Sequence, residues 1–424
     1  MSPRTLVTGI GVIAPNGVGT ERYWAAVLRG EGGIRPVRRF DASAYPCGLA
    51  GEIVAEDFNP AEHVPGRLLP QTDRVTQLAL AAADWAFEDA GVDPAQLPAF
   101  GMGVVTANSA GGYEFGQREL QHLWASGPDH VSAYQSFAWF YAVNTGQLSI
   151  RNGLRGPSGA LVAEQAGGLD ALGQARRMMR KGVPAMLSGA VDSALCPWGW
   201  IAYQSTGLLA TGREPGSAYL PFSANAAGHV PGEGGALLVL EDEQRVRDGG
   251  EGRVYGEIAG YAATFDPPPG SERPAGEGLG RAAALALADA GAEPGEIDVV
   301  FADAAGTPEA DAAEARALRS LFAEGGVPVA APKATTGRLA SGGAALDVAT
   351  ALLSLRDQVI PPAGPVAAAA AEHGVDLVVG APRPAALRTA LVLARGRGGF
   401  NSAIVLRAPD GGARSARTTT GAAR

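Results

Sequence analysis

Short apolar segments alternate with longer segments rich in alanine and leucine along most of this chain. The short segments are bounded by glycine or proline and are apolar throughout, which is typical of strands buried inside a sheet. We predict such strands at residues 5–13, 103–106, 185–187, 236–240, 299–302 and 402–406. We predict helices at residues 77–90, 168–180, 278–290 and 309–322. This alternation favours an α/β fold in which helices cover a largely buried sheet.

Two pairs of similar segments, with one member in each half of the chain, indicate an internal duplication. A Gly-Gly pair precedes an apolar run at residues 234–240 and again at 398–406, and residues 103–108 resemble residues 299–303. The alternative is chance, because 60 of the 424 residues are glycine.

The charged, glycine-bearing segment 241–252 is the natural boundary between the two halves. We therefore predict an N-terminal half at residues 1–250 and a C-terminal half at residues 251–407. The remaining residues, 408–424, are small and polar, so we expect a disordered tail.

The charge and cysteine content exclude several classes of protein. Acidic residues outnumber basic ones by 43 to 34 without long runs of one sign, which argues against a nucleic-acid partner. Two cysteines, Cys47 and Cys196, are too few for a disulfide framework or a four-cysteine metal site. The longest nearly uncharged segment, 182–212, is broken by Asp192, prolines and glycines, so no membrane span is expected. We expect a soluble, cytoplasmic protein.

The segment Gly9-Ile-Gly-Val-Ile-Ala14 formally matches the glycine pattern of dinucleotide-binding loops. Pro15 follows at once, and a proline there would interrupt the helix whose N-terminus should receive the pyrophosphate. We therefore favour a tight loop after the first strand over a Rossmann-type oxidoreductase that binds a nicotinamide dinucleotide.

Residues 156–177 combine a strand, a turn of small residues and a helix, an arrangement that acyl-transfer enzymes use. A buried apolar strand is expected to end near Ala163, and a helix can begin within two or three residues. The free N–H groups at such a helix start can bind an oxyanion, and the turn residue stands where a nucleophile would be placed. That residue is Gln165, whose carboxamide cannot form an acyl-enzyme. An ordinary helix start is the simpler explanation on these residues alone.

Several landmarks together resemble the β-ketoacyl synthases of the thiolase fold, and most closely the chain length factors, the ketosynthase-β subunits of bacterial type II aromatic polyketide synthases. The landmarks are Thr8-Gly-Ile-Gly-Val12, Val162-Ala-Glu-Gln-Ala-Gly-Gly-Leu-Asp170, Pro231-Gly-Glu-Gly-Gly-Ala236, Gly306-Thr307 and Gly398-Gly-Phe-Asn401. The run Ala-Glu-Gln-Ala-Gly-Gly marks the chain length factors, and the others mark the wider superfamily. The resemblance spans residues 4–407. It implies a duplicated thiolase-like fold with two five-stranded sheets, layered as helix, sheet, helix, sheet and helix.

The resemblance also implies where an active ketosynthase carries its cysteine nucleophile and two histidines. The cysteine position is Gln165. Matching the family's His-Gly-Thr motif to Gly306-Thr307 places Ala305 at the first histidine, and the Lys-x-x-x-Gly-His motif places Arg338 at the second. The family's gate, Gly-Phe-Gly-Gly, is Gly-Arg-Gly-Gly at residues 396–399. We therefore expect a non-catalytic chain that retains the elbow.

The remaining histidines and cysteines are not expected to replace the missing groups. Five histidines lie outside the motif positions and are predicted to be structural or exposed: His63, His122, His130, His229 and His373. Cys196 precedes a proline, so we expect it to lie away from a helix start and not to act as a nucleophile.

The resemblance implies a role beside a catalytic ketosynthase-α partner, with a buried polyketide tunnel across the interface of the heterodimer. Tyr113, Gly116 and Leu120 are spaced to share one helix face and would close the tunnel, with Trp200 as a further wall. Gly116 would leave room for a product longer than the shortest class in the family. The alternative is ordinary core packing. No cofactor is expected on this chain, because phosphopantetheine would be carried by the partner acyl carrier protein.

Other interpretations stay open from the sequence. Arg176, Arg177, Arg180 and Lys181 suit docking of an acidic acyl carrier protein, and a solvated helix face explains them as well. Segment 136–145 concentrates aromatic residues, as either a subunit interface or a core segment would. The rival functions are a malonyl-carrier decarboxylase that uses Gln165 to supply an acetyl starter and, less favoured, an active ketosynthase.

Overall fold

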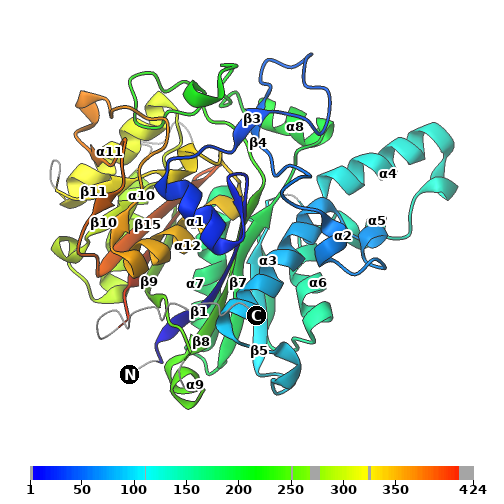
Figure 1. The fold of residues 1–424 in the computed structure, drawn as a ribbon, viewed down its shortest axis with the longest axis horizontal. Helices are drawn as coiled ribbons and strands as arrows, with labels where there is room; N and C mark the ends of the chain where they lie inside the picture. The colour runs from blue at the N-terminus through cyan, green and yellow to red at the C-terminus, as the bar shows by residue number, and fades with distance from the viewer. Residues whose placement is uncertain (1–2, 110, 250–251, 268–276, 323–325, 410–424) are drawn as a thin grey trace, which may run out of the picture.

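The N-terminal half forms a five-stranded section of mixed sheet (Figure 1). The computed structural model describes residues 3–109, 111–249, 252–267, 277–322 and 326–409. The strands lie in the order β6 (Ser158–Leu161), β5 (Met102–Ala107), β7 (Ala185–Asp192), β8 (Gly234–Asp242) and β1 (Thr5–Ala14). β5 is parallel to β6 and β7, whereas β8 is antiparallel to both β7 and β1.

The C-terminal half repeats this order and these strand directions. Its strands are β11 (Pro328–Ala330), β10 (Val299–Phe301), β15 (Thr389–Gly396), β16 (Phe400–Arg407) and β9 (Gly256–Phe265). β10 is parallel to β11 and β15, and β16 is antiparallel to β15 and β9. The repeat confirms the duplication and the six predicted strands.

One detail of the sheets differs from the prediction. β1 and β9 pair at Leu6 with Glu257 and at Val7 with Gly256, which joins the two sections. Together with β2 (Gly17–Val18) and β13 (Asp376–Leu377), the strands of the two sections therefore make one twelve-stranded sheet instead of two separate ones.

Helices form three layers around the two sheet sections. α3 (Arg74–Ala90) and α6 (Val143–Asn152) cover the N-terminal section, and α10 (Glu277–Ala290) and α11 (Pro308–Phe322) lie on the side of the C-terminal section. α7 (Gly167–Met179) and α12 (Ser341–Asp357) contact strands of both sections and lie between them. This arrangement is the predicted helix, sheet, helix, sheet, helix stack, and all four predicted helices are present.

The buried helix α12 was not predicted. Every residue from Ser341 to Leu355 is buried, so the helix has no polar face and no amphipathic pattern that would mark it in the sequence. The remaining helices and short strands are α1 (Thr20–Leu28), α2 (Pro60–His63), α4 (Tyr113–Ser126), α5 (Gln135–Ala138), α8 (Pro197–Gln204), α9 (Glu243–Asp248), β3 (Ile34–Pro36), β4 (Leu49–Gly51), β12 (Val359–Ile360) and β14 (Arg383–Pro384).

The Gly9-x-Gly11 pattern serves packing inside β1, so its prediction as a loop after the strand is wrong. A Cβ atom at Gly9 would lie 2.2 Å from the carbonyl oxygen of Ala86, and one at Gly11 would lie 1.8 Å from that of Ala82. Both carbonyls belong to α3, which can lie against β1 only where the strand lacks side chains. The Rossmann alternative lacks its required loop at this place.

The predicted boundaries at residues 250 and 407 remain predictions, and residues 410–424 of the predicted tail lie outside the described residues. Among the helices in the described part of the chain, none combines the length and apolarity needed to cross a membrane. α4 projects from the body of the molecule, with α5 near its base (Figure 1).

Candidate functional site

The predicted elbow is present between the two sheet sections. β6 ends at Leu161, a short 3₁₀ turn covers Glu164–Ala166, and α7 begins at Gly167. Glu164 has a φ of 48°, a left-handed conformation that side-chain-bearing residues rarely adopt and that turns the chain into the helix. β6 differs from the prediction in being a partly exposed edge strand that, among the described strands, pairs only with β5.

Gln165 lies at the elbow and has no exposed surface. Oriented by its hydrogen-bonding partners, its amide nitrogen donates to the Ala340 carbonyl at 3.3 Å and its oxygen accepts from Lys333 Nζ at 3.3 Å. A Cβ atom at Gly343 would lie 2.9 Å from the Gln165 amide, so the start of α12 also closes on it. The side chain therefore fills the turn of the elbow and is held on three sides.

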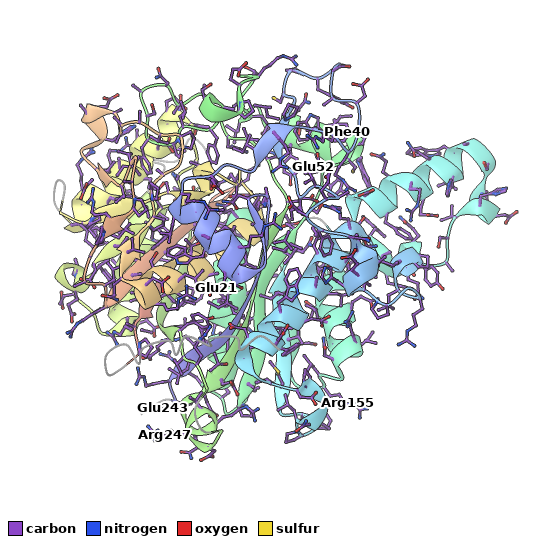
Figure 2. All side chains as sticks on the ribbon, viewed as in Figure 1. Glu21, Phe40, Glu52, Arg155, Glu243 and Arg247 are labelled. Atoms are coloured by element: carbon purple, nitrogen blue, oxygen red, sulfur yellow. The ribbon has the colours of Figure 1, made fainter. Side chains whose placement is uncertain are left out.

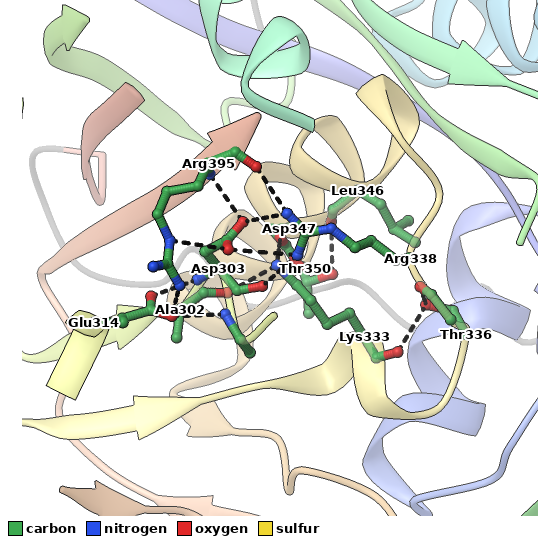
Figure 3. A network of polar contacts seen from close by, with 12 residues as sticks. Ala302, Asp303, Glu314, Lys333, Thr336, Arg338, Leu346, Asp347, Thr350 and Arg395 are labelled. Carbon is green, nitrogen blue, oxygen red and sulfur yellow. Dashed lines mark hydrogen bonds and ion pairs between the residues drawn. The ribbon is translucent and has the colours of Figure 1, made fainter. Parts of the chain in front are cut away.

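The structure places Asp303, and not Ala305, opposite Arg338 (Figure 3). Arg338 Nη2 donates to Asp303 Oδ1 at 3.0 Å, whereas Ala305 is half-buried two residues further along the loop. The assignment of Ala305 to the first histidine position is therefore not supported by the geometry. Placing the His-Gly-Thr motif two residues earlier, on Asp303, brings the two histidine positions face to face.

Asp303 is the centre of a buried network of charges (Figure 3). Arg395, near the end of β15, donates through its backbone N–H and through Nε to the two oxygens of Asp303, at 2.9 and 3.2 Å. Arg395 also pairs with Glu314 of α11 at 3.2 Å, and Lys333 pairs with Asp347 of α12 at 2.6 Å. Three acidic and three basic side chains therefore balance one another inside the protein.

The neighbouring cations determine the protonation state of Asp303. Arg338, Arg395 and Lys333 hold the pKa of this carboxyl well below its usual range despite complete burial. At Glu314, the effect of burial is larger than the attraction of Arg395, so the pKa of this carboxyl is raised. The site thus holds an ionised aspartate between two guanidinium groups, and neither position offers the proton-transfer group that a histidine would supply.

Three of the five described non-glycine residues with positive φ lie around this network: Glu164, Ala304 and Ala340, with φ of 48°, 49° and 48°. Each is adjacent to, or within two residues of, Gln165, Asp303 or Arg338. Strained backbone of this kind concentrates at functional sites. This strain marks the loops around Gln165, Asp303 and Arg338 as a candidate functional site.

Asp192 at the end of β7 connects this site to the start of α12. Its Oδ2 atom accepts from the backbone N–H groups of Ser109 at 2.9 Å and Ser341 at 3.1 Å. Burial raises its pKa to about 6, above the value of about 3.9 expected in the unfolded chain. The folded state therefore retains a proton that the unfolded state has lost between roughly pH 4 and 6.

We expect Asp192→Asn to flatten the pH dependence of stability. In the wild type, this carboxyl makes the free energy of unfolding fall as the pH rises from about 4 to about 6. An asparagine keeps an oxygen for both N–H groups and does not titrate. Urea unfolding of both proteins from pH 4 to 8 measures the difference. Parallel curves across this range would contradict the assignment of the raised pKa.

The predicted tunnel residues lie on α4, and a neighbouring tryptophan was missed. Tyr113 packs against Trp198, with ring centroids 4.8 Å apart. A Cβ atom at Gly116 would lie 3.1 Å from Cζ3 of Trp198 and 3.5 Å from Cβ of Trp139. Leu120 is half-buried on the same helix. Gly116 thus faces two tryptophans, and its lack of a side chain lets them pack closely against α4.

Trp200, predicted as a further wall, lies in a different environment. It is completely buried, donates from its ring nitrogen to the Cys47 carbonyl at 3.2 Å and contacts Phe40, which is labelled in Figure 2. This is the core-packing alternative. Trp198, two residues earlier, is 37% exposed and lies beside Gly116. The two residues lie about 200° apart around α8, and the sequence does not say which of these two faces meets α4.

Exposed aromatic side chains surround α4. They are Trp124, Tyr134, Phe137, Trp139, Phe140, Tyr141 and Trp198. α4 contacts both α5 and α8, and Figure 2 shows side chains extending outward along the length of α4. Exposure of so many large rings favours the interface alternative for residues 136–145 over the core alternative. We call these seven residues the aromatic surface.

The predicted basic cluster is only partly available to a carrier protein. Arg176 is buried and pairs with Asp289 at 2.5 Å, and Arg180 reaches the same carboxylate at 3.2 Å. Arg177, Arg180 and Lys181 are exposed. This geometry favours a role for Arg176 and Arg180 in joining α7 to the C-terminal half.

Cys196 and the histidines do not form an alternative active centre in the described part of the chain. Cys196 is the N-cap of α8, so its expected separation from a helix start is wrong, because Pro197 suits the first helical position. Burial raises the pKa of its thiol to about 11, which disfavours the thiolate. His229 precedes the segment that pairs with Arg338, and burial lowers its pKa to about 3.

The duplicated fold and its elbow define a thiolase-like chain, and comparison with known proteins gives the family. Residues 3–245 match the β-ketoacyl synthase N-terminal domain, and residues 255–366 match the C-terminal domain. The chain therefore belongs to the β-ketoacyl synthase family. Within this family it groups with the ketosynthase-β subunits, or chain length factors, of type II polyketide synthases.

The sequence similarity extends over nearly the whole chain. It is 62% identical over 402 residues to actinorhodin polyketide β-ketoacyl synthase 2 of Streptomyces coelicolor, covering 95% of this chain and 98% of that protein. It is 57% identical over 403 residues to the tetracenomycin polyketide synthase ketoacyl synthase beta subunit of Streptomyces glaucescens, with coverage of 95% and 98%.

Two solved structures share the fold. One is a type II polyketide synthase acyl carrier protein in complex with its ketosynthase bound to the hexaketide, with a TM-score of 0.87, 25% identity and coverage of 97% and 100%. The other is the ishigamide ketosynthase/chain length factor, with a TM-score of 0.87, 26% identity and coverage of 96% and 100%.

Proposed function

We propose that this chain is the length-determining subunit of a minimal type II polyketide synthase. It pairs with a ketosynthase that carries the cysteine and both histidines, and that partner performs decarboxylative condensation of malonyl units delivered on the phosphopantetheine of an acyl carrier protein. This chain contributes a wall of the cavity into which the poly-β-ketone grows. Tyr113, Gly116 and Leu120, together with Trp198, line that wall.

The observation that carries the proposal is the combination of a retained elbow with a filled active centre. Gln165 stands at the nucleophile position without exposed surface, and Asp303 and Arg338 occupy the facing positions as an ion pair. No covalent acyl transfer can begin at a carboxamide, so the geometry supports a role through shape.

The aromatic surface supports a partner subunit of similar fold. Such a cluster of exposed rings on one side of a chain is typical of a permanent interface. β6 adds a strand edge without a partner in the part of the chain that the structure describes, where it bonds only to β5. The pairing of ketosynthase and chain length factor in the ishigamide structure is the precedent.

The test compares this chain alone with the chain co-purified with its native ketosynthase, each supplied with malonyl-loaded carrier protein. We expect condensation products only from the pair. Carbon dioxide release by the isolated chain that is lost in Gln165→Ala would instead support the decarboxylase. An acyl group bound covalently to the isolated chain would contradict the proposal.

A further inference from the structure

The first turn of α4 is capped by a side chain from another helix. Its own N-cap residue, Gly112, makes no side-chain hydrogen bond. The N–H group of Phe115 in the first turn donates instead to Asp73 Oδ2 at 2.7 Å. An unsatisfied N–H at a buried helix start would be unfavourable, so this bond defines where α4 begins.

Asp73 caps two helices at once. It is the N-cap of α3, where Oδ1 accepts from the Val75 N–H at 2.9 Å. Each carboxylate oxygen therefore holds one helix start. The side chain is 3% exposed, and burial raises its pKa to about 7 while the two N–H donors act in the opposite direction.

The contact is close enough to constrain the neighbouring residues. A Cβ atom at Gly112 would lie 2.6 Å from Cβ and 2.9 Å from Cγ of Asp73, so only glycine admits the carboxylate at this position. Arg39 pairs with Glu114 of the same turn. The base of α4 is thereby attached to the body, because α3 packs along β1 in the core.

The rest of α4 extends outward from this base. Its 14 residues span about 21 Å at 1.5 Å per residue. Gly116 directly follows Phe115, and Leu120 lies one turn further out. Next to Gly116, the Gln117 side chain accepts from the Trp198 backbone N–H at 2.7 Å. A small rotation at the base would therefore displace the whole face that carries Gly116 and Leu120.

We infer that Asp73 is a positioning residue that, by capping α3 and α4 with one carboxylate, determines where α4 stands and so which polyketide length the cavity accepts. This inference rests on the proposed function and extends it to a residue outside the cavity wall. Asp73 acts through α4 and does not need to contact the polyketide.

The test is Asp73→Asn, co-expressed with the native ketosynthase and carrier protein. Asparagine has one acceptor oxygen, so one of the two helix starts loses its bond. We expect the ratio of other chain lengths to the main product to rise several-fold, measured by mass spectrometry at equal concentrations of the purified pair. A merely structural role would lower the yield and leave this ratio unchanged.

The matched control is Asp242→Asn. Asp242 caps α9, where it accepts from the Arg245 N–H at 2.7 Å. It lies away from α4, and we expect the product ratio of this variant to equal that of the wild type. A change of the ratio in both variants would overturn the inference.

Two further variants separate the outcomes. If Asp73→Asn does not yield an assembled pair, Arg39→Gln, which removes the Glu114 contact at the same helix base, is measured in its place. An unchanged ratio there would overturn the inference.

If Gly116→Phe shifts the product length while Asp73→Asn does not, only the positioning role fails. If neither variant shifts it, the proposed function fails as well.

Discussion

Gly116→Phe is expected to shorten the polyketide made with the native ketosynthase by one or more two-carbon units. A side chain at this position meets Trp198 and Trp139 at once, since a Cβ atom alone would already lie 3.1 Å and 3.5 Å from their atoms. A phenyl ring must therefore displace these two side chains, which are 37% and 42% exposed. The product profile of the purified pair measures the effect.

A graded series makes this result sharper. Gly116→Ala should change the product least and Gly116→Leu by an intermediate amount, because the added volume grows in that order. Gly295→Phe is the control, because a Cβ atom at this exposed position of the C-terminal half meets nothing within 4 Å. An unchanged main product in Gly116→Phe, with the pair intact, would show that α4 does not limit the chain.

Asp303→Ala should lower the free energy of unfolding by about 3–5 kcal/mol, the range for removing one partner of a buried ion pair. Asp303 is completely buried and pairs with both Arg338 and Arg395, at 3.0 and 3.2 Å. Without its carboxylate, two guanidinium groups face each other, and only Arg395 keeps an acidic partner, Glu314. Urea unfolding of the purified protein, with the native partner where needed, measures the loss.

Two comparisons isolate this effect. Glu31→Ala removes an ion pair with Arg29 in which the Arg29 and Glu31 side chains are 58% and 53% exposed, and should leave the stability nearly unchanged. The double variant Asp303→Ala, Arg338→Met removes the unpaired charge and should recover part of the loss. A double variant no more stable than Asp303→Ala would contradict the network in Figure 3.

Some of the residues predicted to line the tunnel could be chosen from the sequence, and others could not. The spacing of Tyr113, Gly116 and Leu120 is a property of one helix, and the structure places all three on α4. The tryptophan beside them depends on how α8 meets α4, and local sequence carries no information about that contact. For this reason Trp200 was chosen where Trp198 makes the contact.

At the candidate functional site, too, the sequence indicates some residues and only the tertiary structure reveals the others. The family resemblance predicts Gln165 and Arg338 at the positions where active ketosynthases have cysteine and histidine, because each belongs to a contiguous motif. The motif near residue 305 is degenerate, so its alignment could be set only by three-dimensional geometry, which puts Asp303 opposite Arg338. Arg395 and Glu314 belong to no motif and were missed, although a buried charge requires a counterion nearby.

The amino-acid pattern by itself determined the strands and the amphipathic helices, since these depend on residues close together in the chain. Repeated segments in its two halves indicated the duplication, and the family resemblance predicted the loss of the nucleophile. The tertiary structure alone decided the fully buried helix α12, the partners of Asp303 and the double cap at Asp73. These features depend on contacts between residues far apart in the sequence, as in the pairing of Asp73 with the Phe115 N–H. Burial leaves each such polar group only the partners that packing brings within reach.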